Sequence, residues 1–196
     1  FERAGVVGPK FTAGHSIHLS DDAFRRMSSS KSSISFCPTS NLFLGSGLFM
    51  IHKAKSTETP VLLGVGTDVG AGDSFSILRT LNHAYKVAGL QSQKLSALKG
   101  LYLATLGGAR SLFLEDEIGS FDPGKFADLV VTNTRSTSVK RFRAEQVRID
   151  ASKSAEDQGY ERMEHEAFGM MVLGDERAIE ATYVGGELLH QKPSRS

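Results

Sequence analysis

The chain has 196 residues, of which 23 are basic and 22 acidic, so its formal net charge is +1. This balance produces no extended field of one sign, and we expect neither a nucleic acid nor a membrane surface as a partner. The single cysteine, Cys37, excludes an intrachain disulfide and a cysteine-rich zinc site, and no apolar run approaches the ~20 residues of a membrane span. The first ten residues lack the layout of a signal peptide and read as the middle of a longer protein, for which we expect a cytoplasmic location.

Three apolar strands, each followed by a helix, are expected in the first part of the chain. The strands are expected over residues 10–14, 32–36 and 60–66. Ser20 is a suitable cap for the first helix, which carries Phe24 and Met27 on one face. The second and third helices are expected over residues 47–55 and 74–90. This alternation indicates an α/β fold of parallel βα units, whose ligands bind at the carboxyl ends of the strands.

The second part of the chain is less regular. A helix is expected over residues 96–112, interrupted at Gly107 and Gly108, and a turn followed by a strand over residues 119–131. The polar residues 133–166 read as a surface loop with one helix. Two strand-like runs joined through Gly185 and Gly186 form a hairpin signal before residue 189. Residues 192–196 are expected to be a frayed tail.

The three strands of the first part end in "GHSIH", "CPTSN" and "GTDVG". His15, residues 37–41 and Asp68 are therefore expected at one edge of the sheet. Asp68 alone could simply form a turn, but an imidazole together with a carboxylate suits zinc. Two such groups are too few for a catalytic zinc site, which usually has three protein ligands. The remaining histidines do not complete a site, because none forms a His-x-His pair.

Several other chemistries are excluded by missing motifs. The glycines around Asp68 do not form G-x-G-x-x-G, because position 69 is Val, and no G-K-[ST] phosphate loop occurs. The P-C-x-x-C and H-x-E motifs of zinc deaminases that act on nucleic-acid bases are absent, and so is the G-x-S-x-G elbow of hydrolases. For residues 37–41, two interpretations remain open: a loop stabilised by Ser40 and Asn41 bonding the backbone, or a lining of the pocket.

A resemblance adds to this interpretation. The stretches "GHSIHLSDD", "SISFCPTSNLFLGSGLF", "GVGTDVGAGDSFSILRTLNHAYKV", "IGSFDPGKFADLVV" and "MMVLGDERAIEATYVGGELL" occur in an order and spacing similar to those of guanine deaminases in the amidohydrolase superfamily. The match covers nearly the whole chain. "GTD" and "PGKxADLVV" are shared by many amidohydrolases, whereas "CPTSNLFLGSG" and "LGDERAIEATYVGG" look particular to guanine deaminases.

The resemblance implies the carboxyl-terminal part of a (β/α)8 TIM barrel with part of a small β-sandwich domain, divided into residues 1–115 and 116–196. It implies zinc-dependent hydrolysis of guanine to xanthine and ammonia, and a homodimer. Asp68 would bind the one zinc ion of the site and accept a proton from the attacking water, and His15 would hold that water. The remaining zinc ligands are expected upstream of Phe1.

Three expectations follow from this interpretation. The chain by itself should be inactive, and it should leave an open strand edge near residues 10–14. The apolar helix faces of Ile77, Leu81 and Ala88 should lack their full partners. The alternatives are another amidohydrolase that deaminates or dechlorinates a different heterocycle, and a non-catalytic scaffold protein that keeps the barrel but has lost the metal site.

Overall fold

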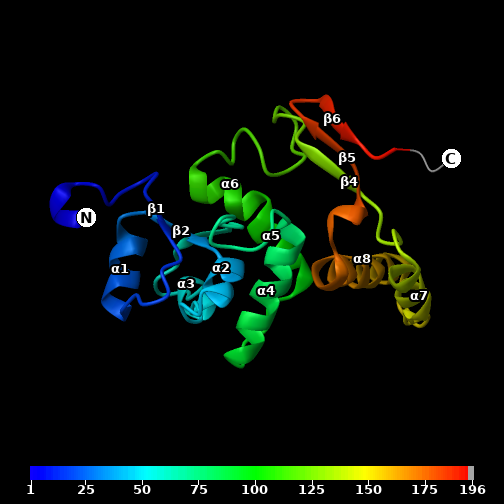
Figure 1. Cartoon of the computed structure of the whole chain (residues 1–196), viewed down its shortest axis with the longest axis horizontal. Coiled ribbons are helices and arrows are strands. Elements are labelled where there is room, and N and C mark those ends of the chain that lie inside the picture. Colours follow the sequence, from blue (N-terminus) through cyan, green and yellow to red (C-terminus); the bar gives the residue numbers. More distant parts are fainter. Residues whose placement is uncertain (194–196) are drawn as a thin grey trace.

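Two three-stranded sheets and eight α-helices make up the part of the chain that the computed structural model describes, residues 1–193 (Figure 1). The strands are β1 (Thr12–Gly14), β2 (Ser33–Phe36), β3 (Leu62–Val65), β4 (Leu129–Thr132), β5 (Ile179–Val184) and β6 (Glu187–Gln191). The helices are α1 (Asp21–Ser29), α2 (Pro38–Phe43), α3 (Ile51–Ala54), α4 (Ile77–Leu90), α5 (Ala97–Ala104), α6 (Leu106–Leu112), α7 (Ser138–Gln146) and α8 (Ala155–Leu173). Two 3₁₀ turns, Glu2–Ala4 and Glu176–Ala178, complete the elements.

The first sheet is parallel, with the strand order β1-β2-β3. Its register pairs Ala13 with Ile34 and Ile34 with Leu63, so that apolar side chains from all three strands align on one face. Because the strands are parallel, their carboxyl ends lie at the same edge, and the residues that follow each strand meet there. This arrangement confirms the parallel βα units predicted from the sequence.

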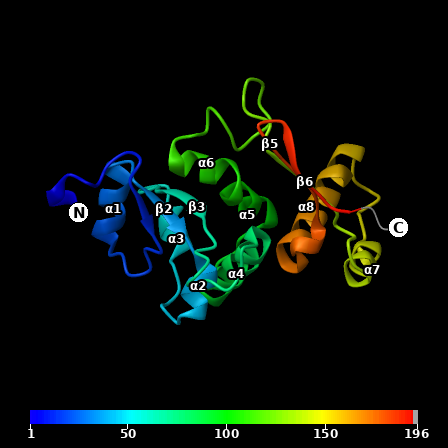
Figure 2. The same cartoon turned by 45° about the horizontal axis from the view of Figure 1, so that its top comes forward.

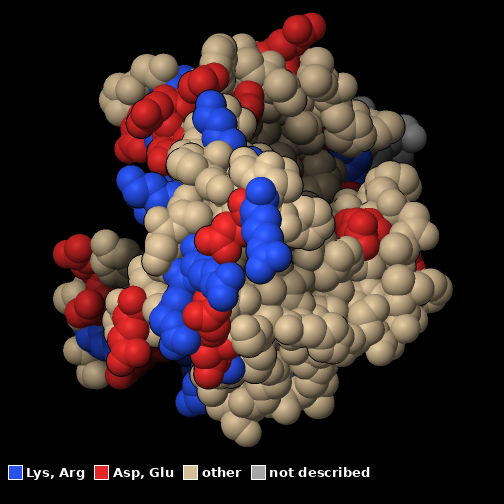
Figure 3. Space-filling model, turned by 90° about the vertical axis from the view of Figure 1, so that its left-hand side faces the viewer, with Lys and Arg blue, Asp and Glu red and all other residues tan. Residues whose placement is uncertain are grey.

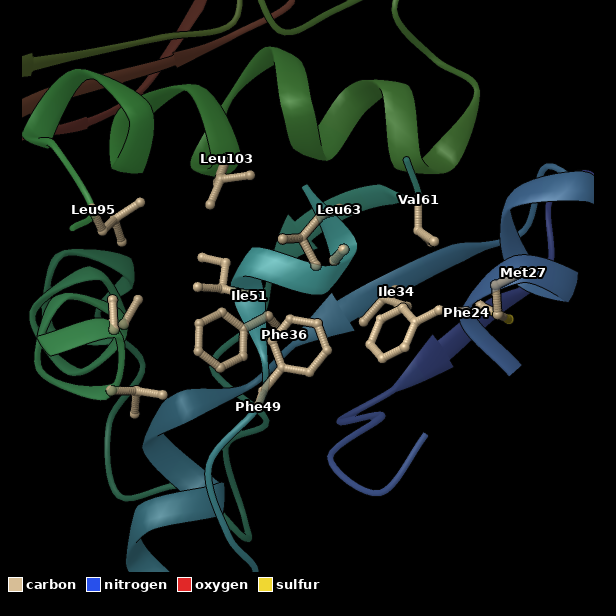
Figure 4. Close-up of a cluster of buried hydrophobic side chains, with 14 residues drawn as sticks. Phe24, Met27, Ile34, Phe36, Phe49, Ile51, Val61, Leu63, Leu95 and Leu103 are labelled. Atoms are coloured by element: carbon tan, nitrogen blue, oxygen red, sulfur yellow. The ribbon is translucent and has the colours of Figure 1, made fainter. Parts of the chain in front are cut away.

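The main core lies between this sheet and the helices that cover it. Phe36 and Phe49 are fully buried, and their ring centroids lie 4.9 Å apart. Figure 4 shows these rings between Ile34 and Leu63 of the sheet and side chains from the surrounding helices. Burying one aromatic or aliphatic side chain of this size contributes ~1.5–3 kcal/mol, so the packed face holds the strands in register. The core holds the strand ends, and the side chains on them, in fixed positions.

Serine caps define the starts of several helices. Ser20 accepts a hydrogen bond from the backbone N–H of Ala23 and begins α1, as predicted from the sequence, with Phe24 and Met27 buried on its inner face. Ser76 caps α4 in the same way, and Ser96 caps α5. Each cap satisfies one of the backbone donors that a helix start leaves without an intrahelical partner.

The second sheet, β4-β5-β6, is antiparallel. Gly185 and Gly186 have φ values of +59° and +84° and form the predicted hairpin turn between β5 and β6. Such a two-residue turn needs positive φ at both positions, which glycine adopts without strain. In both views the helices α4, α5 and α6 lie between the two sheets (Figures 1 and 2). The predicted division of the chain at residues 115 and 116 stays a prediction.

Several predicted helices differ from the helices in the structure. Residues 37–41, interpreted as a self-stabilised loop or a lining of the pocket, lie largely within the helix α2, and the helix expected over residues 47–55 is only the single turn α3. The break predicted at Gly107 and Gly108 falls earlier, at Thr105, which separates α5 from α6. Gly108 serves close packing, since a Cβ added to the facing Gly64 would lie 3.1 Å from the Cα of Gly108.

The polar stretch at residues 133–166 is not a surface loop with one helix. It forms α7 and most of the 19-residue helix α8. Ala167 and Met171 of α8 pack against Leu81, which is completely buried, as is Ala88. The expectation that the helix faces of Leu81 and Ala88 lack partners was therefore wrong, whereas Ile77 is 38% exposed.

Of the predicted tail, Lys192 is held by hydrogen bonds to the Arg177 carbonyl and to Glu180, and residues 194–196 lie outside the described residues.

Acidic and basic side chains alternate within one band on the face shown in Figure 3. Arg26 of α1 forms an ion pair with Glu2 at 3.0 Å. None of the helices among residues 1–193 combines the length and apolar character of a membrane span.

Candidate active site

His15 stands one residue beyond the end of β1. Its backbone N–H donates to the Ser35 carbonyl at 2.9 Å, which extends the β1–β2 ladder to the position where the chain leaves the sheet. The φ angles of His15 and Ser16 are +62° and +53°, a left-handed conformation that is costly for residues with a side chain. The two consecutive left-handed residues turn the chain sharply after β1.

Asp68 lies three residues beyond the end of β3, and it too has a positive φ, +48°. Its carbonyl oxygen accepts hydrogen bonds from the N–H of Gly72 at 2.6 Å and of Ala71 at 3.2 Å, which closes a tight loop behind the carboxylate. A Cβ at Gly72 would lie 2.3 Å from the Thr67 carbonyl oxygen, so this loop leaves space only for glycine. Asp73 pairs with Arg79 of α4 at 2.7 Å and holds the end of the loop.

These two strand ends bring the predicted site residues together. Nε2 of His15 lies 3.6 Å from Oδ2 of Asp68, although 53 positions separate them in the chain. The two side chains are 45% and 35% exposed. The distance is too long for a direct hydrogen bond, but both atoms can contact one and the same water molecule. The arrangement can therefore hold a water molecule and accept its proton.

The tip of the second strand lies beside this pair. Cys37 is buried, and that burial, with a smaller contribution from the nearby Asp68 charge, raises the pKa of its thiol. The thiol therefore stays protonated at neutral pH. Ser40 is buried and donates to the Cys37 carbonyl at 3.1 Å, as expected if residues 37–41 stabilise their own backbone.

Asn41 differs from that expectation. Its Oδ1 lies 2.8 Å from Nδ1 of His15, so its side chain reaches across to the first strand end and does not bond the backbone. The sequence indicated only that the segment of His15 and the segment of Asn41 are close, because both follow neighbouring strands. Which atom the Asn41 amide contacts depends on α2, a helix that the residue pattern did not predict.

His18 is exposed, and His83 lies in α4, where burial and the nearby Lys86 and Arg79 lower the pKa of its imidazole. Phe36 is completely buried in the core, whereas Phe75, in the loop that follows Asp68, is 84% exposed.

The donor set suits one part of a zinc site. Carboxylate and imidazole are common zinc ligands, and both side chains here have accessible polar atoms. Among residues 1–193, no cluster of three or more His, Cys, Asp or Glu side chains could hold a metal ion.

Polar side chains at the carboxyl ends of parallel strands are the arrangement that α/β enzymes use for their active sites. Residues 1–189 match the amidohydrolase family. The chain belongs to that family.

The chain is similar to guanine deaminase of Escherichia coli in sequence and in structure. It is 47% identical over 192 residues to a guanine deaminase of Escherichia coli (strain K12), and the aligned residues cover 98% of this chain and 40% of the relative. The solved structure of E. coli guanine deaminase superposes with a TM-score of 0.87, at 45% identity and over 98% of this chain and 42% of the other.

More distant solved structures share the fold. A guanine deaminase from C. acetobutylicum with guanine bound in its active site has a TM-score of 0.73 and 26% identity, over 96% of this chain and 41% of the other. An adenosine deaminase from Xanthomonas campestris with bound zinc has a TM-score of 0.69 and 25% identity, over 95% of this chain and 38% of the other.

The chain thus spans about two fifths of the length of the relatives that it matches. The predicted fold class is confirmed as a mixed α/β segment of an amidohydrolase barrel enzyme, and the predicted resemblance to guanine deaminases is confirmed.

Proposed function

We propose that this chain is the carboxyl-terminal part of a zinc-dependent guanine deaminase. The reaction joins the water oxygen to the ring carbon that carries the amino group, and ammonia leaves to give xanthine. The observation that carries the proposal is the approach of His15 Nε2 to Asp68 Oδ2 at 3.6 Å, in a chain that is 47% identical to a guanine deaminase over 98% of its length.

Each residue of the pair has a defined task in this reaction. Asp68 would accept the proton of the attacking water and pass it toward the departing amino group. His15, on the other side of that water, would accept a hydrogen bond from it and hold its oxygen in line with the ring carbon. The left-handed backbone at both residues fixes these side chains at the strand ends, so that little reorganisation is needed during the reaction.

Asp68 would also hold one zinc ion. When bound, zinc acts as a Lewis acid that makes water more acidic. Since residues 1–193 contain no cluster of three or more potential ligands, the remaining ligands would come from the part of the enzyme outside this chain. The zinc bound to the X. campestris relative supports this assignment.

The remaining parts of the proposal concern the whole protein. We assign guanine as the substrate, a homodimer as the assembly and the cytoplasm as the location, with no nucleic-acid or membrane partner. Residues 1–115 would form the carboxyl-terminal βα units and closing helices of the barrel, and residues 116–196 would supply carboxyl-terminal strands of the small β-sandwich domain. The net charge of +1 and the interleaved surface charges support a protein that does not bind polyanions.

A different heterocycle is the second candidate substrate, because the X. campestris relative of similar fold is an adenosine deaminase. The test is to assay the intact enzyme, with zinc, against guanine, adenine and cytosine. We expect turnover of guanine at least 10²-fold above the others, because a site that hydrogen-bonds the substrate discriminates strongly against an analogue with different donors.

Asp68→Asn should abolish turnover of guanine, because the amide keeps the shape but neither accepts the proton nor supplies the negative ligand. Activity within threefold of the parent after zinc is restored would contradict the assignment.

This chain alone, purified with zinc, should form no xanthine. Turnover of guanine by it would show that its own residues supply every catalytic group and zinc ligand.

A further inference from the structure

Asn41 forms a hydrogen bond with the ring nitrogen of His15 that does not face Asp68. Its Oδ1 lies 2.8 Å from His15 Nδ1, on the side of the ring opposite to Nε2 and Asp68. Asn41 is 2% exposed, whereas the His15 side chain is 45% exposed. A buried amide therefore anchors a ring whose other nitrogen is open to a ligand.

This contact determines which nitrogen of His15 carries the proton. With the amide oxygen of Asn41 facing it at 2.8 Å, Nδ1 of His15 is the donor, because an amide oxygen only accepts hydrogen bonds. In the neutral imidazole the remaining nitrogen, Nε2, is then an acceptor. Nε2 and Oδ2 of Asp68 consequently present two acceptors, 3.6 Å apart, to the same donor.

The backbone around Asn41 is fixed on both sides. Its N–H donates to the Cys37 carbonyl at 3.1 Å, and its own carbonyl accepts from the N–H of Ser46 at 2.9 Å. The helix α2 is joined to α4 by the hydroxyl of Thr39, which lies 3.4 Å from the Thr80 hydroxyl. The Asn41 amide is thus held by α2, which is itself joined to α4. It can therefore set the orientation of His15, which lies on an exposed turn.

Stability alone does not account for a buried amide here. Nδ2 of Asn41 has no hydrogen-bond partner among the described residues, and an unsatisfied buried donor costs ~1–3 kcal/mol. An apolar side chain of the same size would avoid that cost, while the half-exposed His15 could donate to solvent instead.

We propose that Asn41 is a positioning residue that keeps His15 protonated on Nδ1 and directs its Nε2 acceptor at the water held by Asp68. Its effect on turnover rests on the proposed function, whereas its effect on the tautomer of His15 does not. Loss of such an outer partner of a catalytic histidine typically costs 10–100-fold in activity.

The kinetic experiment uses Asn41→Leu in the intact enzyme. We expect kcat for guanine to fall ~10–100-fold, with KM and zinc content within threefold of the parent and no loss of thermal stability. Asn41→Asp, which keeps an acceptor at the same place, should recover most of kcat. Ser40→Ala is the matched control, because it removes a buried hydroxyl from the same helix without touching His15.

A double-mutant cycle tests whether Asn41 acts through His15. In a His15→Ala background, Asn41→Leu should change kcat less than twofold, since the group that it positions is gone, whereas independent effects would multiply. Multiplying effects, or an Asn41→Leu enzyme with kcat within twofold of the parent, would overturn the proposal.

The tautomer is measured separately by NMR of protein labelled with ¹⁵N-histidine, with His15→Ala to assign the signal. The parent should show His15 protonated on Nδ1, and Asn41→Leu should lose that preference. A His15 protonated on Nε2 in the parent would overturn the proposal. A parent enzyme that turns over no guanine but shows the expected tautomer would instead refute the proposed function alone.

Discussion

Gly72 controls the position of Asp68, and Gly72→Ala tests that control. A Cβ at residue 72 would lie 2.3 Å from the Thr67 carbonyl oxygen and 3.1 Å from that of Asp68. Real Cβ atoms essentially never come closer than 3.0 Å to such atoms, so the backbone must move by at least 0.7 Å, from 2.3 Å to 3.0 Å. Backbone atoms cannot rotate away as a side chain can, so the shift is passed to Asp68 itself.

The size of the effect follows from this displacement. Misplacing a catalytic group by ~1 Å can cost 10²-fold in rate, so we expect kcat/KM for guanine to fall by about 10²-fold in the intact enzyme. Overpacking of a tight loop should also cost ~1–3 kcal/mol of stability. The hydrogen bond from Gly72 N–H to the Asp68 carbonyl, 2.6 Å long, lengthens in the same movement.

The assay compares guanine turnover and thermal unfolding of three proteins: the parent, Gly72→Ala and Gly89→Ala. Gly89 is the control because it is exposed near the end of α4 and a Cβ there has no neighbour within 4 Å. The control should keep full activity. A Gly72→Ala enzyme with kcat/KM within threefold of the parent would refute the steric argument.

Three further predictions concern other parts of the chain. Arg177 and Lys140 lower the pKa of Asp175 to about 2. After a discount for solvent screening, its ion pairs should contribute on the order of 1 kcal/mol at pH 7, fully present above the unfolded value near 3.8 and lost as the pH falls through about 2. Asp175→Asn should therefore destabilise the protein at pH 7, and its difference from the parent in denaturant titrations should shrink as the pH falls toward 2. Gly159→Ala, on an exposed turn of α8 with no atom within 4 Å of the added Cβ, should raise the free energy of unfolding by ~0.5–1 kcal/mol, and a lower melting temperature would contradict this. His15→Ala should lower guanine turnover by ~10² or more while zinc content, measured by atomic absorption, stays near the parent's; complete loss of zinc would show that His15 is a ligand.

Local patterns determined the main elements of this protein. The apolar runs at β1, β2 and β3, each followed by helical spacing, predicted the parallel units, because backbone pairing and helix periodicity depend on residues close in sequence. The cap at Ser20 and the turn at Gly185 and Gly186 were predicted for the same reason. Since parallel strands end at one edge, the sequence also predicted that His15 and Asp68 would meet.

Packing between distant segments decided the rest. The polar stretch that forms α7 and α8 has no clear apolar period. Helix α8 is held by Ala167 and Met171, which are buried against α4 and α5, and by the edge contact of Phe168 with Tyr85 of α4. The contact of Asn41 with His15 joins residues 26 positions apart, through a helix that begins at Pro38 where a loop was expected. Which atom an amide meets depends on the positions of two backbones to within a few tenths of an ångström, and only the packed core sets those positions.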